Sequence, residues 1–91
     1  MNNGQFHKNS ERLDLFLFKV RLFKSRTLAN KACVQKTVLI NDQVAKPSSL
    51  VKLNDVLTLK HLFQQKKYLV LGFPRRNMTK QEAKELIEVL S

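Results

Sequence analysis

The residues with the clearest chemistry are basic, and they lie in a stretch without acidic residues. Between Asp14 and Asp42 there is no Asp or Glu, and the basic residues are Lys19, Arg21, Lys24, Arg26, Lys31 and Lys36. A basic surface without carboxylates attracts phosphate groups. This stretch therefore predicts a nucleic-acid-binding face, in keeping with a formal net charge of +10 for the whole chain.

Three of these residues, Arg21, Lys24 and Arg26, are expected at a corner between two helices. The planar donor fork of Arg matches phosphate oxygens, whereas Lys supplies a mobile point charge. The second helix would add free backbone N–H groups at its N-terminus, where Ser25 would cap the helix or donate to phosphate. The corner is therefore predicted to be a phosphate-binding site.

Other polar residues extend this predicted track along the first helix and toward the sheet edge. They are Arg12, Lys19, Lys31, Lys36, Asn41 and Lys46. The competing interpretation is a generic solvated basic face, and it weighs more for the lysines than for the corner. Asp14 is expected to orient a nearby Arg, and Phe18 is expected to pack under the final helix rather than stack on a base.

The composition argues against catalysis. The two histidines, His7 and His61, have no Cys or carboxylate at metal-ligand spacing. Gly4 and Gly72 are the only glycines, which excludes a glycine-rich phosphate loop. We therefore expect no enzyme, no metal, no cofactor and no small-molecule substrate.

The sequence also argues against a membrane partner. No apolar run approaches the roughly 18 residues of a spanning helix, and the N-terminal MNNGQFHKNS lacks an apolar signal core. The lone Cys33 has no internal disulfide partner and is expected to be a small buried residue. A cytoplasmic location is predicted.

Two helices are expected to position the basic residues. Ser10 would cap the first helix, which would run to about residue 22. Its core face would consist of Leu13, Phe16, Leu17 and Val20. A second apolar strip, on the opposite side of the helix, would consist of Leu15, Phe18 and Leu22. The second helix would span 26–36, with Leu28, Ala29 and Ala32 turned inward, and would follow the very short link Phe23–Lys24.

From residue 37 the apolar pattern alternates, which indicates a small, mainly antiparallel sheet. We expect strands near 37–40, 44–45, 50–53, 56–59 and 68–73, with turns at Asn41–Asp42 and Asn54–Asp55 and an ambiguous connection at 61–67. Thr79 and Glu82 predict a capping box for a final helix whose apolar face would be Ala83, Leu86, Ile87 and Leu90. The predicted organisation is a flexible leader at 1–10, an RNA-binding domain at 11–73, and a basic linker with a helix at 74–91.

Six short motifs occur in order and at fixed spacing, and together they resemble the S4 RNA-binding domain, or alpha-L motif. They are RLDLFL at 12–17, Arg21, KSRTLA at 24–29, VLIND at 38–42, KPS at 46–48 and NDVL at 54–57. The resemblance covers roughly residues 11–60 and implies an α+β fold with a helix pair packed on the sheet. Asp42 and Asn54 stand where the family usually has Gly, and Leu15 replaces a residue that is often Lys.

A free-standing domain with an extra hairpin and a basic C-terminal segment resembles, more narrowly, the heat-shock-protein-15 family, which includes a ribosome quality-control factor. That resemblance implies binding to rRNA, and to tRNA, on large ribosomal subunits that still hold peptidyl-tRNA. Two alternatives stay open. One is a general structured-RNA or DNA-binding module, and the other is a protein-interaction adaptor that uses the strip Leu15, Phe18 and Leu22.

Overall fold

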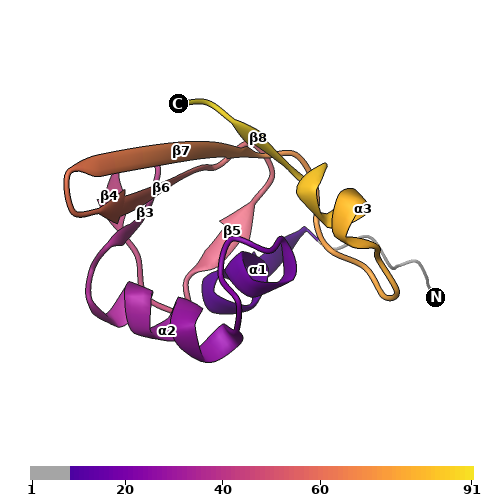
Figure 1. Cartoon of the computed structure of the whole chain (residues 1–91), viewed down its shortest axis with the longest axis horizontal. Coiled ribbons are helices and arrows are strands. Elements are labelled where there is room, and N and C mark those ends of the chain that lie inside the picture. The colour runs from indigo at the N-terminus through magenta and orange to yellow at the C-terminus, as the bar shows by residue number, and fades with distance from the viewer. Residues whose placement is uncertain (1–8) are drawn as a thin grey trace.

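A helix pair covers a small antiparallel sheet in the computed structural model, which describes residues 9–91 (Figure 1). The α+β class predicted from the sequence is confirmed. The helices are α1 (Leu13–Lys19), α2 (Arg26–Val34) and α3 (Lys80–Lys84). The main sheet has the spatial order β4 (Gln43–Val44), β3 (Val38–Ile40), β6 (Val56–His61), β7 (Gln64–Val70) and β8 (Ile87–Val89). A separate antiparallel pair joins β2 (Ser10–Arg12) to β5 (Leu50–Lys52).

The hydrophobic core lies between the helix pair and the sheet. The predicted core face of the first helix is confirmed, because its four residues are at most 1% exposed. Ala29 and Cys33 of α2 meet this face, together with Val38, Leu57 and Val70 of the sheet. Full burial of each large apolar side chain contributes about 1.5–3 kcal/mol. Leu28, expected inside, is 48% exposed, because α2 turns Ala29 and Cys33 toward the core.

The start of α1 differs from the prediction. Ser10 does not cap the helix, because it pairs with Lys52 in the β2–β5 ladder. The first backbone N–H groups of α1 donate instead to a distant loop: Leu13 N to the Ser49 carbonyl at 2.8 Å, and Asp14 N to the Pro47 carbonyl at 3.1 Å. These tertiary partners satisfy donors that a local cap would otherwise serve.

The end of α1 is also earlier than predicted. The helix stops at Lys19, and Arg21 adopts a left-handed backbone with φ of 71°. Arg21 N donates to the Phe18 carbonyl, and Leu22 N donates to the Leu17 carbonyl, both at 3.0 Å. This is a Schellman motif with Arg at the position that usually holds Gly. The link between the helices is therefore residues 20–25, longer than Phe23–Lys24.

Helix α2 closes in the same way, two residues before its predicted end. Lys36 has φ of 64°, its N–H donates to the Cys33 carbonyl, and Thr37 N donates to the Ala32 carbonyl. At the other end the predicted cap is confirmed, since the Ser25 hydroxyl accepts from Leu28 N at 3.1 Å. Both helices thus end on a basic residue in the left-handed region.

The two turns that lack the family's usual glycine are formed by Asn and Asp. Asn41 and Asp42 have φ of 51° and 69° and connect β3 to β4, which is the two-residue hairpin geometry that favours such residues. Asn54 has φ of 70°. The Asn41 side chain ties the turns together, because its amide donates to Asp55 Oδ1 at 3.0 Å and accepts from Val56 N at 2.9 Å.

The C-terminal segment corrects another expectation. The Thr79–Glu82 capping box is present, but α3 ends at Lys84 and does not continue to Leu90. Residues 87–89 instead form β8, which pairs with β7 and places Ile87 opposite Val70. The free edge of β7 offers unpaired backbone groups, and pairing satisfies them while Ile87 packs against the core.

Candidate nucleic-acid interface

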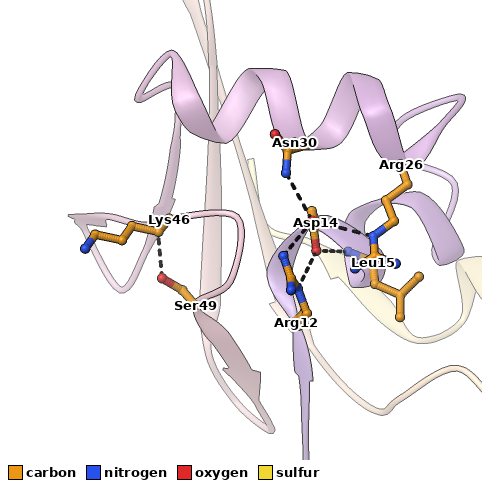
Figure 2. Close-up of polar contacts among 7 residues, drawn as sticks. All are labelled: Arg12, Asp14, Leu15, Arg26, Asn30, Lys46 and Ser49. Atoms are coloured by element: carbon orange, nitrogen blue, oxygen red, sulfur yellow. Dashed lines mark hydrogen bonds and ion pairs between the residues drawn. The ribbon is translucent and has the colours of Figure 1, made fainter.

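A buried carboxylate organises the basic surface between the two N-terminal helices. Asp14 is 2% exposed and accepts two hydrogen bonds from the Arg12 guanidinium, each of 3.2 Å, as Figure 2 shows. Arg26 approaches from α2, with its Nε 3.5 Å from Asp14 Oδ2. The Asn30 amide donates to the same oxygen at 3.3 Å. The expectation that Asp14 orients a nearby Arg is confirmed, and it orients two.

The protonation state of Asp14 follows from these contacts. Burial by itself would raise the pKa of this carboxyl, but hydrogen bonds from Arg12, Asn30 and the Leu15 N–H, together with the charge of Arg26, lower it below its ordinary value. Asp14 is therefore ionised at neutral pH. A buried charge of this kind is stable only when it is paired, and here one carboxylate serves two cations.

The two arginines keep their other donors available. The Arg12 and Arg26 side chains are each 47% exposed, so their heads reach solvent while Asp14 fixes one side of each. A guanidinium has five N–H donors in a planar fork. Arg12, Arg26, Thr27 and Asn30 line a shallow depression around Asp14. This arrangement presents fixed positive donors to an anion and reduces the side-chain ordering that binding would otherwise require.

The other predicted residues do not line the depression around Asp14. Ser25 occupies the N-cap of α2, Lys24 precedes this cap, and Lys31 lies on the helix itself; both lysines are exposed. Lys19 is partly neutralised, because its Nζ lies 3.9 Å from Glu11. Asn41 uses its amide within the turns, as described above.

Arg21, Lys36 and Lys46 are exposed and lie outside the Asp14 cluster. The Lys46 side chain extends away from Asp14 in Figure 2, while its backbone N–H donates to Ser49 Oγ at 2.9 Å. The structure thus brings Arg12 and Arg26 together and spreads the remaining predicted residues over the surface.

Asn30 is the contact that sequence reasoning did not place at the site. It lies four residues after Arg26 on α2, so both side chains leave the same face of the helix. Given that the two helices pair, this four-residue spacing predicts that Asn30 lies beside Arg26 at the site. Leu15 does not carry the charge often found there, and it contributes its backbone N–H to Asp14 Oδ1 at 2.8 Å.

Three further features of residues 9–91 concern metal ligands, the thiol and membrane-spanning helices. No group of three or more His, Cys, Asp or Glu is placed to hold a metal ion within this range. Burial, and then the charge of Asp14, raises the pKa of the Cys33 thiol to about 11, so the reactive thiolate is scarce at neutral pH. No helix in the same range is long and apolar enough to cross a bilayer. His7 lies outside the described residues.

Comparisons with known proteins identify the family to which this chain is similar. The family model of the S4 domain matches residues 11–57. An RQC P-site tRNA stabilizing factor from Halalkalibacterium halodurans is 40% identical over 86% of this chain and 88% of its own length. Heat shock protein 15 from Escherichia coli K12 is 34% identical over 85% of this chain and 58% of its own.

A solved structure extends the likeness to three dimensions. The trimeric structure of heat shock protein 15 from Vibrio cholerae superposes with a TM-score of 0.80 at 28% identity, covering 90% of this chain and 83% of that one. The chain therefore belongs to the S4 domain family, in the group that includes the RQC P-site tRNA stabilizing factors.

Proposed function

We propose that this chain binds structured RNA on the large ribosomal subunit and stabilises a P-site tRNA there during ribosome quality control. The P-site tRNA and the process of ribosome quality control are taken from the names of the relatives, which are RQC P-site tRNA stabilizing factors. The observation that carries the RNA contact is the pair of half-exposed arginine heads, Arg12 and Arg26, held by the buried Asp14. Its place of action would be the cytoplasm, where ribosomes work.

The proposed contact follows the chemistry of the phosphate backbone. Arg12 and Arg26 would each offer a fork of donors to phosphate oxygens, and the N-terminus of α2 would add backbone N–H groups beside Ser25. Lys24 and Lys31 would add charge around this centre, with the remaining lysines and Arg21 at the periphery. This function is binding without a chemical step, so a factor of this kind acts by holding RNA in place.

The fold also weighs against the alternative adaptor function. The strip Leu15, Phe18 and Leu22 does not form one exposed helical face, because α1 ends at Lys19 and Leu22 packs against the core. Phe18, at 36% exposed, remains available by itself.

The decisive experiment compares Arg26→Gln with Lys66→Gln in binding to a structured rRNA fragment and to duplex DNA of equal length. Lys66 is an exposed cation on β7 that forms no salt bridge within residues 9–91. Loss of a charge-assisted hydrogen bond costs about 1.5–3 kcal/mol, so we expect Arg26→Gln to weaken RNA binding at least tenfold and Lys66→Gln to change it little. Equal effects of the two substitutions, or equal affinity for RNA and DNA, would contradict the proposed site.

Placement on the ribosome needs a second measurement. The tagged chain should sediment with free large subunits in a sucrose gradient, and retained peptidyl-tRNA should increase the bound fraction, since it adds phosphates beside the same surface. Arg26→Gln should reduce this association. Sedimentation with small subunits alone would reject the placement and leave a general RNA-binding domain.

A further inference from the structure

A second surface feature lies away from the Asp14 cluster, where the end of α1 meets the turn before α3. A groove of about 620 Å³ opens there, and its volume is in the range of small-ligand sites, about 300–1,000 Å³. Phe18, expected from the sequence to pack under the final helix, is 36% exposed and contributes apolar surface to the groove together with Met78. Its cationic residues are Lys19, Arg21, Arg75 and Arg76.

The charge of this groove is unbalanced. No carboxylate is among its lining residues. Glu11 and Glu82 lie nearby and pair with Lys19 and Arg75, at 3.9 and 3.3 Å. Arg21 and Arg76 form no salt bridge within the described part of the chain, and both are exposed. Two cations that face one cavity without counter-charges favour the entry of an anion.

The groove is also held in shape by the segment that precedes α3. Glu82 accepts from Thr79 N through Oε1 at 2.9 Å, and its other oxygen accepts from the Arg75 guanidinium at 3.3 Å. The Arg75 N–H donates to the Met78 sulfur at 3.2 Å, and Asn77 takes a left-handed backbone with φ of 58°. The capping box thus fixes both the helix start and one wall of the groove.

We propose that this groove takes a single unpaired nucleotide of the bound RNA, with its base against Phe18 and its phosphate at Arg21 and Arg76. The assignment rests on the RNA-binding function proposed above and names the part of the RNA that this surface recognises. An aromatic face next to arginine forks matches a base joined to a phosphate. Paired bases are stacked on their neighbours and cannot reach such a face, so the occupant is unpaired.

The test uses two RNA hairpins that differ only in one bulged nucleotide. The bulged position carries 2-aminopurine, a base whose fluorescence falls when it stacks on an aromatic ring. The variants are Phe18→Leu, which keeps an apolar side chain, and Arg76→Gln. Lys84→Gln, an exposed cation on α3 that does not line the groove, is the matched control.

The natural chain should quench the 2-aminopurine and should prefer the bulged hairpin by about tenfold or more, as expected for base stacking on an aromatic side chain. Phe18→Leu should abolish both the quenching and the preference, with unchanged affinity for the fully paired hairpin. Arg76→Gln should reduce the preference, and Lys84→Gln should keep it.

Three results would overturn the assignment: no preference of the natural chain for the bulge, a preference that survives Phe18→Leu, or unquenched fluorescence in the complex. Tight binding of the paired hairpin in any of these cases would leave the RNA-binding function itself intact. Failure of the natural chain to bind either hairpin would reject both proposals.

Discussion

Substitution of Arg21 by Gly should make the protein more stable and a weaker RNA binder. Arg21 occupies the left-handed position of the α1 Schellman motif, with φ of 71°. For a residue with a Cβ this conformation costs roughly 1–2 kcal/mol, and Gly avoids the clash. Gly gains freedom in the unfolded chain, which offsets about 0.4–1 kcal/mol of that relief. The difference between these two ranges is centred on a net gain of about 0.8 kcal/mol, with extremes of about 0 and 1.6 kcal/mol.

The assay is thermal unfolding of three chains: natural, Arg21→Gly and Arg21→Ala. For a domain of this size about 1 kcal/mol corresponds to 4–8 °C in Tm, so Arg21→Gly should melt a few degrees higher. Arg21→Ala keeps the Cβ and should melt close to the natural chain. Asn54→Gly, at a φ of 70° outside the basic surface, tests the same backbone effect. Its gain should be smaller, because Asn tolerates this region better than Arg.

Both Arg21 variants lose the guanidinium, so both should bind RNA more weakly, by about tenfold if one charge-assisted hydrogen bond is lost. Asn54→Gly should bind as the natural chain does. A Tm for Arg21→Gly at or below that of Arg21→Ala would refute the backbone argument. Unchanged RNA affinity in both variants would refute the view that Arg occupies this position for its charge.

Three further predictions concern the Asp14 cluster, the salt dependence of RNA binding and the turn before α3. Asp14→Asn should lower the free energy of unfolding by about 1–3 kcal/mol, less than for a fully buried pair because the arginine heads reach water. Because the pKa of Asp14 is lowered in the folded state, the stability that Asp14 contributes is present above its ordinary pKa near 3.8 and is lost as pH falls below that value. Denaturant melts of the natural chain and of Asp14→Asn should therefore converge in acid. A difference that stays constant with pH would contradict the pairing. Log affinity for structured RNA should fall with log salt by a slope of several units in filter binding, whereas a flat plot would exclude phosphate contacts. Thr79→Ala should lower the free energy of unfolding by about 1 kcal/mol in denaturant melts, through loss of the cap. It should also weaken binding of the bulged hairpin more than binding of the paired one, because it loosens the turn that holds Arg75. Equal weakening of both hairpins would show that the capping box does not shape the groove.

Local signals in the sequence predict several elements correctly. Ser25 and Thr79 are predicted as caps and act as caps. This signal is local, because each hydroxyl accepts from a backbone N–H only three residues away. The core face of α1 and the turn at Asn41–Asp42 follow from helical periodicity and from the backbone preferences of single residues. The order of the six motifs was sufficient to indicate the S4 domain, which the family match confirms.

The predictions of helix bounds are wrong where a distant segment competes with a local preference. Ser10 is a good capping residue, but strand pairing with Lys52 occupies it, and carbonyls of the loop at 47–49 serve the helix instead. Residues 83–90 have helical periodicity, yet the open edge of β7 draws residues 87–89 into the sheet. In both cases a backbone partner far away in sequence offered hydrogen bonds that no local pattern reveals.

The sequence by itself determined that this protein carries a basic segment without acidic residues on an S4-type helix pair, because charge and periodicity are properties of the chain alone. Only the tertiary structure decided which of those charges act together. Asp14 draws Arg12 and Arg26 into one fixed unit across two helices, because a buried carboxylate requires partners. Arg21 meets Arg75 and Arg76 beside Phe18 because α1 ends early and the chain returns to it some fifty residues later, a proximity that spacing along the sequence does not encode.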